Sequence, residues 1–411
     1  MRLFKNHINK LLNPLAMMCC VLLITTACSD DDDAPVGPQP TGDTEMFVLN
    51  SVSDPGISGM VTFTENDDNS TTVTIDLNGT SNGDMHPSHI HFNTAAEGGD
   101  IAVSLNSVNG NTGMSETVVT MLDNGTSISY DELVSFDGYI NVHLSASDLS
   151  TLVAQGDIGE NALTGEMRTY TLEERDVEGI SGMVTFAERA NGYTLATIEL
   201  MNTPADGMHP AHIHMNSALE GGDIAVTFTP VDGASGMSMT NIEMTDGGNA
   251  LTYNDIIMYD GYVNVHLSAS DLGTIVAQGD IGSNTLTGET IAYALGERDV
   301  AGVSGMVTFA ERMDGTILAT IMLDGTSNGT HPAHIHMNSA EEGGGIVVTF
   351  TPVDGASGVS MTNISMTDGG DAFVYSDVSG YDGYVNVHLS AEDLATLVAQ
   401  GNIGSNANPI N

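Results

Sequence analysis

Three copies of one segment divide this chain. The sequence Ser-Gly-Met-Val-Thr-Phe occupies residues 58–63 and returns at residues 181–186 and 304–309, so the period is 123 residues. Solenoid repeats have periods of about 20–50 residues, and each copy here is therefore expected to be a domain with a core of its own. We predict domains over residues 44–163, 164–286 and 287–411, preceded by a leader at residues 1–27 and an acidic, proline-containing tether at residues 28–43.

The pattern inside each copy is that of β-strands. In residues 72–77, valine, isoleucine and leucine alternate with threonine and aspartate, which is the period of a strand with one buried face. Short apolar runs of this kind are separated by turn sequences such as Asp123-Asn124-Gly125. The pattern predicts an all-β protein of three tandem antiparallel β-sandwiches with Greek-key connections. One helical turn is expected over residues 146–154.

The first residues of the chain have the pattern of a bacterial secretory signal. Arg2, Lys5 and Lys10 precede a short apolar run, and small residues then lead to Cys28, which a serine and four aspartates follow. A cysteine at this place resembles the lipidated residue of bacterial lipoproteins, and the acidic run resembles the export tag of surface lipoproteins. We therefore expect a secreted protein that is lipid-anchored at Cys28 to the outer membrane, on the cell surface. An ordinary signal peptide cut near Ala27 is the alternative.

The charge balance excludes several classes of partner. The chain has 54 acidic and 8 basic residues and a formal net charge of −46, and three of the basic residues lie in the leader. Such a surface repels nucleic acids and anionic lipids and concentrates cations. We expect metal ions as partners, no nucleic acid, and contact with a membrane only through the lipid anchor. Cys28 is the only cysteine after the leader, so no disulfide is expected within the folded part.

Histidine is concentrated in one repeated motif. The sequence His-Pro-Ser-His-Ile-His fills residues 86–91 and returns, with alanine in place of serine, at residues 209–214 and 331–336. A further histidine follows the first histidine of each copy by 57 residues (from 86 to 143, for example), in the frame Tyr-x-Asn-Val-His-Leu. Twelve of the 13 histidines belong to these three sets, and the remaining one lies in the leader. So selective a use of histidine indicates a site that needs imidazole chemistry.

Strand alternation predicts that the histidines of each set converge. His89 and His91 point to one face of their strand, whereas Ile90 points into the core. In the later strand His143 lies on the outer face, and Leu144 is expected on the buried face. Three imidazoles on neighbouring strands form a suitable ligand set for copper or zinc, and copper(II) has the higher intrinsic affinity. The predicted metal ligands are His89, His91 and His143 in the first copy, His212, His214 and His266 in the second, and His334, His336 and His388 in the third.

Other residues near the motif have weaker interpretations. Glutamates and asparagines at fixed offsets are expected to cap loops, with support of the histidines as the alternative (Glu97, Glu220 and Glu342; Asn93, Asn216 and Asn338). Asp100 and Asp223 are not required by a shared site, because the third copy has Gly345 at that place. Four nearby methionines are expected to pack against apolar neighbours rather than to bind cuprous copper (Met85, Met208, Met215 and Met337).

The three copies resemble the CHRD domain, which is named for chordin and is also found in bacterial secreted proteins. The resemblance covers nearly all of residues 44–405 and rests on Ser-Gly-x-Val-Thr-Phe, His-x-x-His-Ile-His and Tyr-x-Asn-Val-His. Each copy closes on a segment such as Gly-Asp-Ile-Gly at residues 156–159, which is similar to the Gly-Glu-Ile-Arg-Gly of the family but lacks its arginine.

A more distant resemblance is to Cu/Zn superoxide dismutase, in which a His-x-x-His-x-His strand and a later histidine bind copper on a Greek-key β-barrel. It implies a superoxide-dismutase-like or immunoglobulin-like sandwich, with His89, His91 and His143 at the places of the copper ligands. It also implies a structural or supporting role for the first histidine of each motif (His86, His209 and His331). The bridging histidine, the zinc-loop ligands and the disulfide of the dismutases have no counterparts.

Three classes of function remain open on these patterns. Metal binding is favoured, because imidazoles recur at ligand spacing. In the second class the histidines are structural, and the domains form an adhesion or protein-interaction module for an extracellular protein or polysaccharide. In the third the protein is a dismutase-like oxidoreductase. Residues 29–167 contain no arginine or lysine, so superoxide would not be steered to the first site, and we expect a binding module rather than an enzyme.

Overall fold

The computed structural model describes residues 37–53 and 56–410. The predicted leader and Cys28 lie outside the described residues, and so does most of the tether. The first strand begins at Pro40, four residues before the predicted start of the first domain. Within the described residues, no helix is long and apolar enough to cross a membrane.

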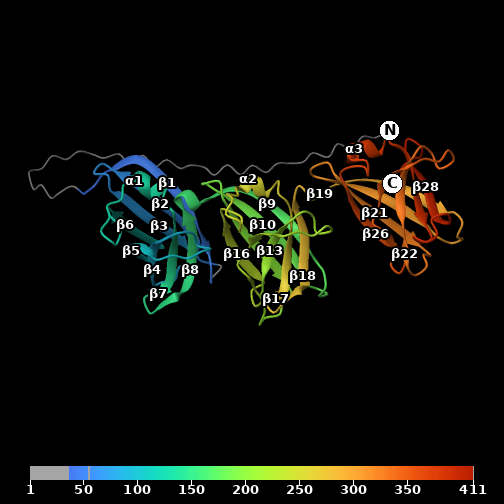
Figure 1. The fold of residues 1–411 in the computed structure, drawn as a ribbon. Coiled ribbons are helices and arrows are strands. Elements are labelled where there is room, and N and C mark those ends of the chain that lie inside the picture. Colours follow the sequence, from blue (N-terminus) through green and yellow to red (C-terminus); the bar gives the residue numbers. More distant parts are fainter. Residues whose placement is uncertain (1–36, 54–55, 411) are drawn as a thin grey trace, which may run out of the picture.

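The described chain is almost entirely antiparallel β-structure, which confirms the predicted fold class. Figure 1 shows three β units that follow one another in a row, from blue through green to red. We call them the first, second and third units, and they contain strands β1–β8, β9–β18 and β19–β28. Each unit has a separate cluster of buried apolar side chains, as expected of repeats that each bury their own core.

The first unit is a closed barrel with the strand order β1-β2-β3-β6-β5-β4-β7-β8. This order places β4 beside β7, although 45 residues lie between Phe92 and Gly138 along the chain. The strands are β1 (Pro40–Ser51), β2 (Ser58–Asn66), β3 (Thr71–Asn78), β4 (Met85–Phe92), β5 (Ile101–Asn109), β6 (Met114–Val119), β7 (Gly138–Ser145) and β8 (Asp148–Ile158). The short helices are α1 (Tyr130–Val134) and the 3-10 turn at Gly159–Asn161.

The second and third units repeat this arrangement as ten-stranded sheets, because the strands corresponding to β4 and β5 are each divided in two. The second unit contains β9 (Leu163–Glu174), β10 (Ser181–Arg189), β11 (Thr194–Met201), β12 (Met208–His209), β13 (Ala211–Met215), β14 (Ile224–Thr227), β15 (Val231–Asp232), β16 (Met237–Ile242), α2 (Tyr253–Ile256), β17 (Asp260–Ser268) and β18 (Asp271–Gly282). The third contains β19 (Leu286–Glu297), β20 (Ser304–Arg312), β21 (Ile317–Asp324), β22 (Thr330–His331), β23 (Ala333–Met337), β24 (Ile346–Thr349), β25 (Val353–Asp354), β26 (Val359–Ile364), α3 (Tyr375–Val378), β27 (Asp382–His388) and β28 (Leu397–Gly404).

The helical turn predicted over residues 146–154 is wrong. These residues form the tip of a hairpin and the start of β8. Ser145 accepts a hydrogen bond from the backbone of Asp148, whose carboxylate accepts one from the backbone of Thr151. Such side-chain bonds cap a helix in some sequences and close a turn in others, and here they close a turn.

A buried arginine joins each pair of consecutive units. Arg189, at the end of β10, is fully buried, and its Nη1 donates to Asp157 Oδ2 of the first unit at 2.7 Å. Arg312 makes the same contact with Asp280 of the second unit at 2.9 Å. Each arginine also donates to a main-chain carbonyl beside that aspartate, on Asn161 or Asn284. We call these contacts the junctions.

The two ends of the array lack the charged residues of a junction. In the first unit the place of Arg189 and Arg312 is held by Asn66, whose amide donates to Ser70 Oγ at 2.9 Å within the same unit. In the third unit the place of Asp157 and Asp280 is held by Asn402. Its Oδ1 accepts the hydrogen bond of Ala340 N at 2.8 Å, as Asp157 Oδ1 accepts that of Ala95 N at 2.7 Å.

Candidate metal centre

The neighbouring strands β4 and β7 bring the histidines of the first unit together. His89 lies opposite Asn141 and His91 opposite Tyr139 in the antiparallel register, and Ile90 between them is fully buried in the core. One nitrogen from each of His89, His91 and His143 lies within 4.8 Å of the other two. The same clusters form in the second unit (His212, His214 and His266) and in the third (His334, His336 and His388). We call these clusters the triads.

The pairing of β7 with β8 is irregular at His143. The register between β7 and β8 shifts on both sides of His143, where His143 pairs with Leu152 after Val142 has paired with Ala154. The extra residues lie on β8, and His143 keeps the alternation of β7, which places it on the same face as Tyr139 and Asn141. The prediction that Leu144 is buried is wrong, since 41% of its surface is exposed.

Hydrogen bonds to main-chain carbonyls fix the tautomers of two histidines in each triad. His143 donates from Nδ1 to the carbonyl of Leu149 at 2.7 Å, and His91 donates from Nδ1 to that of Gly99 at 2.9 Å. Because a neutral imidazole carries one N–H, the lone pair of each ring is then on Nε2. The bonds recur at 2.7–3.0 Å in the other units (His266 to Leu272, His388 to Leu394, His214 to Gly222 and His336 to Gly344).

Several of the remaining nitrogens point at one another or have no partner, whereas His336 Nε2 lies 3.5 Å from Asn386 Nδ2. His89 Nδ1 lies 3.1 Å from His143 Nε2, and His212 Nδ1 lies 3.1 Å from His266 Nε2. Other triad nitrogens are buried without a hydrogen-bond partner (Nε2 of His91, His214 and His388, and Nδ1 of His334). A buried polar atom without a partner costs free energy, and a cation held by these lone pairs would satisfy it. The donor set thus fits a metal ion in all three units.

Aromatic rings hold the second histidine of each triad in place. Tyr139 stacks on His91 with the ring centroids 4.9 Å apart and the planes 18° from parallel, and its hydroxyl accepts a hydrogen bond from Gly99 N at 3.1 Å. Tyr262 and Tyr384 stack in the same way on His214 and His336. This tyrosine opens the repeated frame Tyr-x-Asn-Val-His-Leu, but the pattern alone does not indicate its role in the site.

Burial lowers the pKa of two histidines in each triad and so favours their neutral form. Desolvation lowers the pKa of His89 and of His143 below the ordinary histidine value, and the positive charge of a neighbouring imidazole lowers that of His89 further. Burial lowers the pKa of His212 to about 4. The pKa values of His266, His334 and His388 are lowered by burial too. A neutral imidazole is the form that binds a metal ion.

The first histidine of each motif lies outside the triad. His86 is buried, and its Nδ1 donates to the main-chain carbonyl of His143 at 3.2 Å. His209 and His331 make the same contact with His266 and His388 at 3.2 Å. In the first unit this contact ties β4 to β7, and none of the three side chains contributes a nitrogen to a triad.

The loop after the motif is capped by the residues predicted to cap it. Asn93, at a φ of 66°, donates to the carbonyl of Gly98, and the Glu97 carboxylate accepts from Thr94 Oγ1 at 2.7 Å. The corresponding asparagines and glutamates make the same bonds in the other units. The triads contain no carboxylate, so Asp100 and Asp223 are not brought to them.

The four methionines beside the motif do not pack in the core. Their exposed fractions are 50% for Met85, 53% for Met208, 40% for Met215 and 48% for Met337. The expectation of packing is therefore wrong, because strand alternation directs these side chains to solvent.

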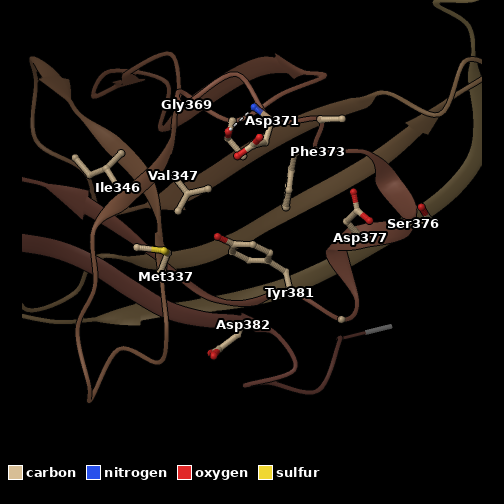
Figure 2. A pocket seen from close by; sticks show the side chains of 13 residues that line it. Met337, Ile346, Val347, Gly369, Asp371, Phe373, Ser376, Asp377, Tyr381 and Asp382 are labelled. Carbon is tan, nitrogen blue, oxygen red and sulfur yellow. Dashed lines mark hydrogen bonds between the residues drawn. The ribbon is translucent and has the colours of Figure 1, made fainter.

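A cleft of about 790 Å³ in the third unit lies apart from the triad. Figure 2 shows Met337, Val347, Phe373 and Tyr381 around it, and no histidine lines it. In the first unit the counterparts of Met337 and Tyr381 are Phe92 and Phe136, whose rings pack 5.5 Å apart.

Comparison with models of known families, with curated proteins and with solved structures gave no match. The chemistry of the triads therefore carries the functional interpretation.

Proposed function

We propose that this protein binds up to three transition-metal ions, one at the triad of each unit, through imidazole nitrogens alone. The observation that carries the proposal is the convergence of three nitrogens within 4.8 Å in all three units. In the first unit the ligand atoms are Nδ1 of His89 and Nε2 of His91 and His143. When the metal is absent, the proton between His89 and His143 occupies the place that the ion would take.

Copper and zinc are the metals that this donor set fits. Imidazole suits both, three protein ligands leave one coordination position open, and copper(II) exceeds zinc(II) in intrinsic affinity for a given nitrogen site. The main-chain acceptors of Leu149 and Gly99 supply the outer hydrogen bonds that raise the basicity of ligating histidines and fix their orientation. In the same proposal the protein is a CHRD-type lipoprotein of the cell surface that captures or stores metal, as the sequence of the leader and of the repeats suggests.

The test is metal stoichiometry. His89, His91 and His143 are changed together to alanine, and copper(II) and zinc(II) binding is measured by elemental analysis after dialysis of the full chain. The variant is expected to hold one ion fewer than the unaltered protein, because the other two triads stay intact. His86→Ala is the control: it is expected to lower stability and keep the metal count.

Equal metal content in the triple variant and the unaltered protein would reject the proposal. The histidines would then be structural, as an adhesion or protein-interaction module requires. In that case, changing only His334, His336 and His388 to alanine would also leave the metal content unaltered.

A further inference from the structure

Every methionine in the described part of the chain lies at the surface. The chain has 23 methionines, and three of them (Met1, Met17 and Met18) precede the described residues. The other twenty are all exposed, from 39% for Met306 to 63% for Met201. Methionine is ordinarily among the residues most often buried, so a complete exclusion from three cores is unusual.

Neither strand propensity nor solubility explains these positions. Exposed strand positions favour threonine and other β-branched residues, and methionine offers no advantage in pairing. An exposed thioether also leaves apolar surface in water and is open to oxidation. The property that methionine brings and threonine lacks is a soft sulfur donor.

The strand register places two methionines on either side of one carboxylate in the first unit. Met60 on β2 lies opposite Asp76 on β3, which lies opposite Met114 on β6. All three side chains are exposed on the outer face of the barrel. In the second unit Met183, Glu199 and Met237 form the same row across β10, β11 and β16. We call these the methionine rows.

The spacing of a row allows its sulfurs to meet. Neighbouring strands lie about 4.8 Å apart, so the two methionine backbones of a row are separated by about 9.6 Å. Methionine has three rotatable side-chain bonds, so both side chains are long enough and flexible enough to bring their sulfurs above the central carboxylate. Thioethers select soft ions such as Cu(I), and hard ions such as Mg²⁺ and Ca²⁺ prefer oxygen. One carboxylate balances the charge of one monovalent cation.

We propose that the methionine rows of the first and second units are a second class of metal site, which binds a soft monovalent cation of the Cu(I) or Ag(I) type. The rows are separate from the triads: in the first unit a row spans β2, β3 and β6, whereas the triad lies on β4 and β7. The net charge of −46 raises the local concentration of any cation around both. In the third unit Met306 pairs directly with Met322 and no carboxylate lies between them, so this unit is an internal comparison.

The experiment titrates Ag(I), which binds thioethers and does not change its oxidation state, into the full chain after the triads have been saturated with Zn(II). Methionine methyl groups carry ¹³C, and their NMR signals report each sulfur separately. The methyl signals of Met60 and Met114 are expected to shift together at the first additions, and so are those of Met183 and Met237. The signal of Met121, which is exposed outside the rows, is expected to shift only later.

Variants test whether the row is one site. Met60→Leu with Met114→Leu keeps the apolar volume and is expected to remove one bound Ag(I) per chain; Met121→Leu, the matched control, is expected to remove none. Asp76→Asn is expected to weaken Ag(I) binding at the first row and leave the second row unaltered. Bound Ag(I) is also expected to slow the conversion of Met60 and Met114 to sulfoxide by hydrogen peroxide, because the same sulfur lone pairs are engaged.

Simultaneous shifts of all twenty methyl signals, or an unchanged Ag(I) count in the double leucine variant, would overturn the proposal. The first result would mean that each thioether acts alone, for instance as a target for oxidants. The Zn(II) count, measured in the same samples, tests the triads independently, so either class of site can fail without the other.

Discussion

At the scale of single residues, the triads are built to stay uncharged. The three imidazoles lie beside one another, and two of them donate their protons to main-chain carbonyls. Protonation of one ring would place a positive charge near two others in a site of reduced polarity. Acidification therefore lowers the free energy of unfolding of the metal-free protein.

We expect the metal-free protein to lose stability as the pH falls below about 6.5. The pKa of His212 is lowered from 6.5 to about 4 in the folded state, so the unfolded chain binds the proton more readily. Stability supplied by the neutral form is complete above the unfolded pKa, and its loss is complete near the folded one. Urea denaturation at pH values between 7 and 5, where most carboxylates remain ionised, measures the effect. Replacing His212, His214 and His266 with glutamine should reduce the pH dependence, and an unchanged dependence would contradict this explanation.

The side chains of the triads could be predicted from the sequence, but their hydrogen-bond acceptors could not. Alternation along a strand places His89 and His91 on one face whatever the rest of the fold does. The carbonyls of Gly99 and Leu149 carry no side-chain signal, and their positions depend on the conformation of a loop and of a hairpin. The stacking of Tyr139 on His91 follows from the cross-strand register, which a single sequence does not fix.

At the scale of elements, the loop after β4 controls the orientation of His91. The loop turns back at Asn93, and Gly99 approaches the carbonyl of Phe92 so closely that an added Cβ would lie 1.9 Å from that oxygen. Gly222 and Gly344 are in the same position in the other units, with 2.0 and 2.1 Å. A side chain at any of them would displace the carbonyl to which the histidine donates.

Gly99→Ala is expected to weaken metal binding at the first triad alone. Loss of an outer hydrogen bond to a ligand typically lowers metal affinity by about 10–100-fold. Isothermal titration of the full chain should then resolve one weakened site and two unaltered ones. Gly247→Ala is the control, since a Cβ there meets its nearest neighbour at 3.6 Å, an ordinary contact. Three sites of unchanged affinity in Gly99→Ala would mean that the loop does not orient His91.

The same serine and acidic-residue spacing begins a helix at one place in this chain and closes a hairpin at another. Ser129 and Glu132 form a capping box at the start of α1, and that pattern was available in the sequence. Ser145 and Asp148 have the same spacing, yet they close the hairpin between β7 and β8. The strands decide between the two outcomes, because β8 must pair with both β7 and β1 to close the barrel.

At the scale of the whole molecule, the junctions make the three units one array. Arg189 is buried between two units and pairs with Asp157, which also accepts a hydrogen bond from Ala95 in the loop after β4. Asn241 and Asn363 extend the contact by donating to Glu97 and Ser217 in the corresponding loops of the preceding units. The threefold repeat was evident from the sequence. The ion pair was not, because Arg189 belongs to the second unit and Asp157 to the first, and the pattern within one repeat does not predict a contact between two repeats.

Arg189→Ala is expected to cost about 3–5 kcal/mol of stability, because it leaves the Asp157 carboxylate buried without its partner. The free energy of unfolding in urea gives the loss, and small-angle X-ray scattering should show a wider range of angles between the first two units. Arg175→Ala, at an exposed position, is the control and should change neither measurement. A stable, rigid Arg189→Ala protein would show that the ion pair contributes little to the junction.

The asparagines at the two ends of the array are expected to keep one molecule from adding to the next. A head-to-tail contact has no natural stopping point, and copies of a self-complementary array would add to one another and form filaments. Here Asn66 offers no cation and Asn402 no anion, so neither end can complete an ion pair with another molecule. The combined change Asn66→Arg and Asn402→Asp is expected to yield species that grow with concentration in sedimentation velocity runs, whereas the unaltered protein stays monomeric. Two neutral side chains would thus set the metal capacity of one particle at three triads and keep a strongly repeating sequence from polymerising.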